Sequence, residues 1–132
     1  MKSIIPDISV DNCKEAIEFY KAIFRGELQM VQMADGKEMF KGHEGKIIHS
    51  ELHINENCVM YFTDIFGDKP KSGNVQLVLE MDSQTQIEKV YSELSNSGKV
   101  KFELQKTFWG AYHAVLTDKY SVTWELNYTV KE

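Results

Sequence analysis

The sequence of 132 residues lacks the features that mark a membrane span, an export signal or a nucleic-acid surface. It has no run of about 18 apolar residues, the length that crosses a bilayer. Pro6 and Asp7 interrupt the N-terminal segment, so the apolar core of a signal peptide is missing. The net charge of −5 leaves no surplus of Lys and Arg for the basic patch that nucleic acid requires. We therefore expect neither a membrane nor nucleic acid among its partners.

Cysteine is also scarce. The chain has two, Cys13 and Cys58, in apolar surroundings and without CxxC spacing. This usage predicts two reduced, buried thiols in a cytoplasmic protein. Neither cysteine has a neighbour in the sequence that would lower its pKa, as a reactive thiol requires. We expect no catalytic cysteine.

Three common catalytic motifs are absent: GxSxG, the Walker-type glycine loop and GxGxxG. What is present is the composition of an ordinary globular domain, with 42% hydrophobic and 27% charged residues. Composition therefore excludes several classes of protein but indicates no chemistry.

The first half of the chain predicts a strand followed by an amphipathic helix. Residues 4–10 are short, apolar and partly alternating, and Asp11 offers a side-chain oxygen as a helix cap. Gly26 suits the end of the helix. The apolar positions between them follow helical spacing: Cys13, Ala16, Ile17, Tyr20, Ile23 and Phe24.

The same pattern returns 71 positions later. Residues 75–81 predict a strand, Asp82 or Ser83 a cap, and Gly98 the end of a second helix. The helix again carries apolar residues at helical spacing: Ile87, Val90, Tyr91 and Leu94. Because caps and stops recur together with the apolar spacing, we interpret the chain as a duplication.

Three strands follow each helix in this interpretation. They are predicted at 27–33, 47–54 and 57–63, and at 99–105, 111–117 and 121–128. In this alignment His49 matches His113, 64 positions on, and Phe62 matches Glu125, 63 positions on. The segment 34–46 contains three glycines and predicts a hairpin loop or a lid.

The fold class predicted is α+β, with two βαβββ modules. Module 1 spans 1–66, module 2 spans 74–132, and a Gly- and Pro-containing linker lies at about 64–74. A module of this size buries too little surface to form a good core alone. We therefore expect contacts between modules, and a second chain, to contribute to the fold.

Alternation along the last strand places Glu125 opposite an apolar face. Val122, Trp124 and Leu126 share one face, which we expect to meet the helix, and Glu125 lies on the other. That other face is free to hold a ligand. We accordingly place Trp109 nearer a cavity than Trp124.

The sequence resembles a known superfamily at these elements. DNCKEAIEFYKAIFRGEL, HSELHINENCVMYFTD and FWGAYHAVLTDKYSVTWEL look like the glyoxalase, bleomycin-resistance and dioxygenase group, also called vicinal oxygen chelate, and its PhnB-like branch. Some members of that branch carry a demethylubiquinone methyltransferase label. The resemblance implies a curved mixed sheet around a ligand cavity, and it implies a homodimer.

The resemblance also implies four positions for metal ligands. Carried onto this chain they are Ile5, Phe62, Gln76 and Glu125. Isoleucine and phenylalanine offer no donor atom, whereas divalent ions require several oxygen or nitrogen donors. We expect no cofactor and no intact four-ligand centre. A shift of two residues would bring in Asp7, and Gln76 and Glu125 remain the candidate ligands if an ion binds.

His49, Glu51 and His53 alternate along one predicted strand and therefore share a face. They are consistent with a metal or acid–base site, or with a solvent-facing strand whose other face points inward. His113 lies near Trp109 in the sequence and could line a pocket or serve the structure alone.

Three functions follow as alternatives. The first is a protein that binds a small apolar or aromatic ligand, without an intact metal centre. The second is a metal-dependent lyase, isomerase or dioxygenase that uses Glu125 and Gln76. The third is a structural or regulatory dimer. For the first we expect the ligand to contact Phe62, Gln76, Trp109, His113 and Glu125.

Overall fold

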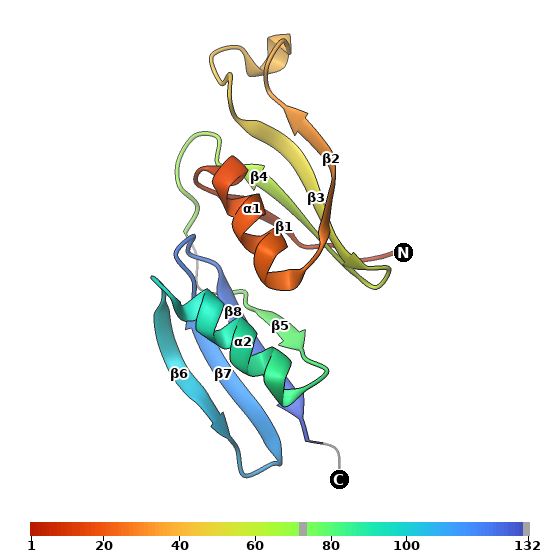
Figure 1. Ribbon diagram of the computed structural model, residues 1–132. Coiled ribbons are helices and arrows are strands. Elements are labelled where there is room, and N and C mark those ends of the chain that lie inside the picture. Colours follow the sequence, from red (N-terminus) through yellow and green to blue (C-terminus); the bar gives the residue numbers. More distant parts are fainter. Residues whose placement is uncertain (72–73, 131–132) are drawn as a thin grey trace. The chain divides into compact units, whose positions relative to one another are not determined.

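The computed structural model describes residues 1–71 and 74–130. The chain divides into two compact units, Met1–Lys69 and Pro70–Glu132. The division falls inside the segment predicted as a linker, of which residues 72–73 lie outside the described residues. In each unit a helix lies against one face of a sheet (Figure 1). No helix of the described part of the chain is long and apolar enough to span a membrane.

Unit 1 contains four strands and one α-helix. Its sheet has the order β1-β4-β3-β2, with β1 parallel to β4 and the other pairs antiparallel. In chain order the elements are β1 (Asp7–Val10), α1 (Cys13–Phe24), β2 (Glu27–Met33), β3 (Ile47–Asn55) and β4 (Cys58–Asp64).

Unit 2 repeats this arrangement. Its sheet has the order β5-β8-β7-β6, with β5 parallel to β8 and the other pairs antiparallel. In chain order the elements are β5 (Leu77–Glu80), α2 (Gln84–Ser95), β6 (Lys99–Lys106), β7 (Ala111–Thr117) and β8 (Thr123–Thr129). The predicted α+β fold of two βαβββ modules is confirmed, each module with its own mixed four-stranded sheet.

Each module's first strand is shorter than predicted, 7–10 instead of 4–10 and 77–80 instead of 75–81. Pro6 has no N–H to donate to a neighbouring strand. Its carbonyl oxygen still accepts a hydrogen bond from the Tyr61 N–H at 2.9 Å. The ladder therefore begins one residue after the proline.

The core of each unit lies between the helix and the sheet. In unit 1 the Phe62 ring stacks on Tyr20 with 4.8 Å between ring centroids, and both side chains are fully buried. In unit 2 Trp124 and Leu126 are fully buried, as are Ile87 and Leu94 of α2. Burial of such large apolar side chains contributes roughly 1.5–3 kcal/mol each.

The strand register corrects one step of the predicted repeat. Glu51 pairs with Tyr61, and Val115, 64 positions after Glu51, pairs with Glu125. The same spacing makes Tyr61 the counterpart of Glu125, so the alignment of Phe62 with Glu125 is wrong. A shift of one residue reverses the face of a strand. Phe62 accordingly points into the core, whereas Glu125 points away from it.

The two helices begin in different ways. The predicted cap Asp11 is wrong for α1: Asn12 precedes the helix, with φ of 52° and no capping bond from its side chain. Instead the Cys13 N–H donates to Oδ1 of Asp64 at 3.0 Å, and the Ile47 N–H donates to Oδ2 at 2.7 Å. For α2, Ser83 is the cap and accepts from the Gln86 N–H at 3.1 Å.

The glycines after the helices serve close packing. The left-handed residues there are Arg25 and Ser97, with φ of 56° and 66°. A Cβ on Gly26 would lie 2.7 Å from a methyl carbon of Leu52, and one on Gly98 would lie 2.6 Å from the Thr117 carbonyl oxygen. Each glycine therefore lets the chain pass directly over its own sheet.

The segment 34–46 forms an ordered turn in unit 1 with a short 3₁₀-helix, Glu38–Phe40. The Gly45 N–H donates to the Asp35 carboxylate at 2.8 Å, and Lys46 Nζ donates to the Ile65 carbonyl oxygen at 2.9 Å. The Phe40 and Phe66 rings lie 5.4 Å apart. The first bond closes the segment on itself, and the contacts of Lys46 and Phe40 attach it to the chain that follows β4.

The prediction of two buried thiols is half right. Cys13 is buried in α1, but Cys58 is exposed at the first position of β4, beside the turn that joins β3 to β4. Burial, with a smaller effect of the Asp64 carboxylate, raises the pKa of Cys13 to about 12. At neutral pH this thiol is therefore protonated and unreactive.

Replacing Asp64 should destabilise the protein. The carboxylate is buried and joins the start of α1 to β3. Because hydrogen bonds to charged groups contribute roughly 1.5–3 kcal/mol, we expect Asp64→Asn to lower the free energy of unfolding by about 2–3 kcal/mol in urea. Asp68→Asn, in the exposed segment after β4, is the matched control and should have little effect. Equal stability of Asp64→Asn and wild type would refute this role.

The two thiols should differ in reactivity. We expect one thiol to react with Ellman's reagent in the native protein and both to react after unfolding in guanidinium chloride. Cys58→Ser should abolish the native reaction, because a thiol with a pKa of about 12 is almost entirely protonated at the pH of the assay. Rapid labelling of native Cys58→Ser would contradict the burial of Cys13.

Candidate functional site

The helix-free face of the unit 2 sheet brings His113 and Glu125 together. Both residues belong to neighbouring antiparallel strands, β7 and β8, in which His113 pairs with Asn127 and Val115 with Glu125. Nε2 of His113 lies 2.9 Å from Oε1 of Glu125, and both side chains are partly buried. The carboxylate can hold the imidazole in one orientation, as in other imidazole–carboxylate pairs.

The turn between β6 and β7 places aromatic side chains beside this pair. The Thr107 N–H donates to the Ala111 carbonyl oxygen at 2.7 Å, and Gly110 adopts φ of 81°, which glycine tolerates best. Trp109 is 54% exposed, and its ring meets the His113 ring edge-on at 5.7 Å. Phe108, 97% exposed, lies edge-on to Trp109 at 4.9 Å.

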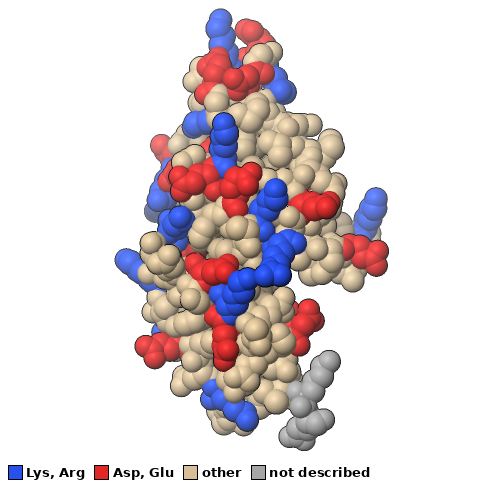
Figure 2. Space-filling model, in the orientation of Figure 1, with Lys and Arg blue, Asp and Glu red and all other residues tan. Residues whose placement is uncertain are grey.

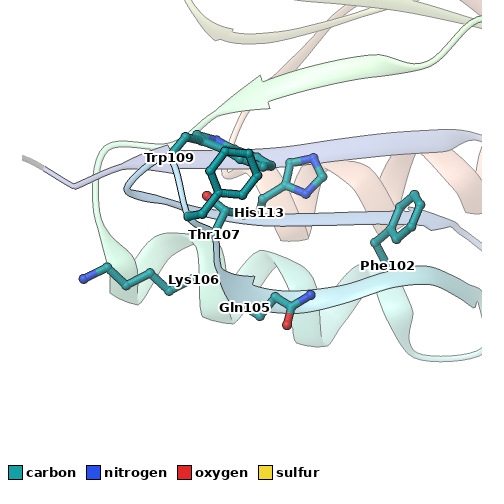
Figure 3. Close-up of a pocket in the computed structure, with 7 residues that line it drawn as sticks. Phe102, Gln105, Lys106, Thr107, Trp109 and His113 are labelled. Carbon is teal, nitrogen blue, oxygen red and sulfur yellow. The ribbon is translucent and has the colours of Figure 1, made fainter.

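Two hollows adjoin Trp109 and His113, which line both. The hollow on the β6 side has a volume of about 440 Å³, and the hollow on the β5 side about 480 Å³. We call them the β6 hollow and the β5 hollow. The β6 hollow is also lined by Phe102, Gln105, Lys106, Thr107 and Phe108 (Figure 3). The β5 hollow is also lined by Val78, Glu80, Glu125 and Asn127.

The size and lining of these hollows suit a small molecule. Pockets for small ligands commonly measure roughly 300–1,000 Å³ and combine apolar walls with a few placed polar groups. Here Trp109 and Phe102 supply apolar surface, and His113 with Glu125 supplies a hydrogen-bonding pair. The arrangement can stack a flat ligand and orient it through one polar group.

The structure assembles three of the five residues predicted to contact a ligand: Trp109, His113 and Glu125. Gln76 is exposed just before β5 and lines neither hollow. Phe62 lies in the core beneath α1 in the other unit, so its placement does not support a ligand contact.

Sequence reasoning missed several residues that line the hollows: Val78, Glu80, Phe102, Phe108 and Asn127. Alternation could have found Glu80 and Asn127. Asn127 shares a face with Glu125, and Glu80 pairs with Asn127 across parallel strands. Phe102 could not have been found this way, because β6 carries irregular register on both sides of it.

The residues at the inherited ligand positions do not fit a four-ligand metal centre. With the corrected register the set becomes Ile5, Tyr61, Gln76 and Glu125, and Ile5 still has no donor atom. Asp7 pairs with Tyr61 as Val78 pairs with Glu125, so Asp7 is the counterpart of Val78 and not of Gln76. Within the described residues no group of three or more His, Cys, Asp or Glu is arranged to hold an ion.

The helix-free face of unit 1 carries a different cluster. Glu51 accepts from Nε2 of His49 and from Nε2 of His53, each at 2.8 Å. These hydrogen bonds lower the pKa of Glu51 below its ordinary value of 4.5. The His49 ring also meets Tyr61 edge-on at 4.8 Å. His49 and His113 occupy equivalent positions of the repeat. The carboxylate partner of His49 lies on the same strand, whereas the carboxylate partner of His113 lies on the neighbouring strand.

The surface on the helix side of the sheets carries charges of both signs. Figure 2 shows Lys and Arg side chains interspersed with Asp and Glu on the face that it draws. Exposed pairs of this kind contribute little to stability. The hydrogen-bonded clusters on the helix-free faces are therefore the more informative electrostatic features.

Glu51 should make the stability of the protein depend on acidity. Because its pKa is lowered in the folded state, its contribution is complete above the ordinary value of 4.5 and is lost as the pH falls through the lowered value. We expect the melting temperature of Glu51→Gln to fall less steeply than that of wild type between about pH 6 and about pH 3. Glu56→Gln, in the exposed turn after β3, should follow wild type. Parallel curves for Glu51→Gln and wild type would count against the two hydrogen bonds.

Comparison with solved structures supports the same architecture. The chain is similar to protein PA1353 of Pseudomonas aeruginosa, with a TM-score of 0.85, 26% identity and 98% of each chain covered. It also shares its fold with a Bacillus cereus PhnB protein named as a putative 3-demethylubiquinone-9 3-methyltransferase. That match has a TM-score of 0.82 and 21% identity, covering 97% of this chain and 100% of the other.

Comparison of sequences leads to the family. Protein YjdN of Escherichia coli K12 is 25% identical over 130 residues, covering 88% of this chain and 87% of YjdN. The uncharacterized protein Rv0887c of Mycobacterium tuberculosis is 30% identical over 139 residues, covering 98% of this chain and 76% of Rv0887c. A family model matches residues 4–126. The chain therefore belongs to the Glyoxalase/Bleomycin resistance protein/Dioxygenase superfamily.

Proposed function

We propose that this protein binds a small apolar or aromatic molecule on the helix-free face of unit 2. The observation that carries the proposal is the position of Trp109, which is half exposed between the two hollows and in edge contact with His113. An indole that is already exposed offers a flat surface to a ligand, because the side chain does not have to move out of a core first.

The neighbouring apolar side chains favour a ligand with a flat apolar part. Phe102 and Val78 are each 52% exposed and line opposite hollows. Exposed apolar surface of this kind is unfavourable in water unless something covers it. A planar ligand that stacks on Trp109 would remove part of this surface from water on both sides.

The hydrogen-bonded pair of His113 and Glu125 would orient such a ligand. One nitrogen of the imidazole faces Glu125 at 2.9 Å, and the other is available to a polar group of the ligand. Because the nitrogen that faces Glu125 donates to the carboxylate, the other nitrogen can accept a hydrogen bond from a hydroxyl or an N–H of the ligand. The activity in the name of the Bacillus cereus neighbour does not enter the proposal, because that likeness is one of fold.

Titration with small aromatic molecules tests the proposal. We expect indole, 2-naphthol or 7-hydroxycoumarin to bind with measurable heat and to shift the melting temperature upward. Trp109→Ala should weaken binding about tenfold, since aromatic stacking contributes roughly 0.5–1.5 kcal/mol beyond area burial. His113→Ala should weaken binding of the hydroxyl compounds more than binding of apolar analogues.

Met39→Ala is the control, because Met39 is an exposed apolar side chain in unit 1, 85% exposed, and lines neither hollow. It should bind as wild type does. If the panel fails to bind, or if Trp109→Ala binds every compound with wild-type affinity, the proposal is wrong.

A further inference from the structure

We infer that the β5 hollow takes a positively charged organic group, so that the ligand is an apolar or aromatic ammonium or amidinium compound. The inference rests on the proposed function and specifies its ligand class. It depends on three observations: two carboxylates in the lining, an aromatic wall, and the absence of Lys and Arg from the residues that line this hollow.

The two carboxylates come from neighbouring strands. β5 and β8 are parallel, with Val78 beside Glu125 and Glu80 beside Asn127. Asn127 shares a face of β8 with Glu125, because side chains two residues apart on a strand point to the same side. Glu80 lies beside Asn127, so Glu80 and Glu125 both project to the helix-free side. The hollow therefore has two acidic groups along one wall.

Their hydrogen-bond partners are an amide and an imidazole. The oxygens of Glu80 accept from Asn127 Nδ2 at 3.1 and 2.9 Å, and Oε1 of Glu125 lies 2.9 Å from His113. In the described part of the chain neither carboxylate forms an ion pair with Lys or Arg. An ionised carboxylate has room for about four hydrogen bonds, so both groups keep unused acceptor capacity.

The aromatic wall adds attraction for the same charge. A cation over an indole face gains about 0.5–1 kcal/mol at an exposed site and more when water is excluded. Trp109 is the aromatic residue of the β5 hollow and is 54% exposed. An ammonium group there would meet the indole and two carboxylates together.

The β6 hollow has the opposite character. Lys106 lines it, and Nζ of Lys101 lies 5.6 Å from the centroid of Phe102, another lining residue. The protein's own cations therefore occupy that side. The geometry assigns the apolar part of the ligand to the surface of Trp109 and its positive group to the β5 hollow.

A series of naphthalene compounds whose polar groups differ in charge tests the assignment. We choose 1-naphthylmethylammonium, 1-naphthalenemethanol and 1-naphthoate, each titrated into the full chain by calorimetry. We expect the cation to bind about five- to tenfold more tightly than the alcohol and the anion to bind most weakly. The preference for the cation should decline as sodium chloride is added.

Two variants locate the effect. Glu80→Gln and Glu125→Gln should each reduce the ratio of cation to alcohol affinity about two- to fivefold, as expected for partly exposed charges. Glu56→Gln, in the exposed turn of unit 1, is the matched control and should keep the wild-type ratio. Circular dichroism of each variant verifies folding.

The outcomes separate this inference from the proposed function. If the alcohol binds through Trp109 but the cation has no advantage, the ligand class is wrong and the proposed function stands. The same holds if the cation advantage survives in both Gln variants. If none of the three compounds binds, the proposed function fails together with the inference.

Discussion

The antiparallel pairing of β7 with β8 is the constraint on which the rest of unit 2 depends. It sends Trp124 and Leu126 into the core beneath α2 and leaves Glu125 on the opposite face, within hydrogen-bonding distance of His113. A shift by one residue would bury the carboxylate and expose the indole. Since burial of an unpaired carboxylate costs several kcal/mol, packing of the core and assembly of the site select the same register.

Buried carboxylates reinforce this arrangement in both units, but at different places. In unit 1 Asp64, at the end of β4, holds the first turn of α1 and the start of β3. In unit 2 Asp118, just after β7, accepts from Nε1 of Trp124 at 2.8 Å and from the Val122 N–H at 3.1 Å. In each module a buried carboxylate therefore accepts hydrogen bonds from backbone or indole N–H groups, but the segments that it joins differ between the two modules.

The two helix-free faces have diverged further than the cores. His49 and His113 occupy the same position of the repeat, yet His49 shares Glu51 with His53 on a single strand, and His113 pairs with Glu125 across strands. In unit 2 the turn before β7 places Trp109 against His113, whereas in unit 1 the segment before β3 packs Phe40 against Phe66. The position equivalent to Glu125 in unit 1 is Tyr61, so the chain no longer presents matching donors in its two halves. This divergence is consistent with the proposal that unit 2 recognises a ligand through its own side chains, without a metal ion held jointly by the two units.

The sequence by itself determined the order of elements, the duplication and the face of each residue in β8, because apolar periodicity and turn residues are local signals. It also predicted Trp109, His113 and Glu125 as ligand contacts, and the structure brings these three side chains together. Only the tertiary structure decided which residues stand opposite one another across strands. Tyr61 replaced Phe62 as the counterpart of Glu125, Asp64 replaced Asp11 at the start of α1, and Cys58 proved exposed. Contacts between residues far apart in the chain depend on register and bulges, and a single residue of shift in either reverses the face on which a side chain lies.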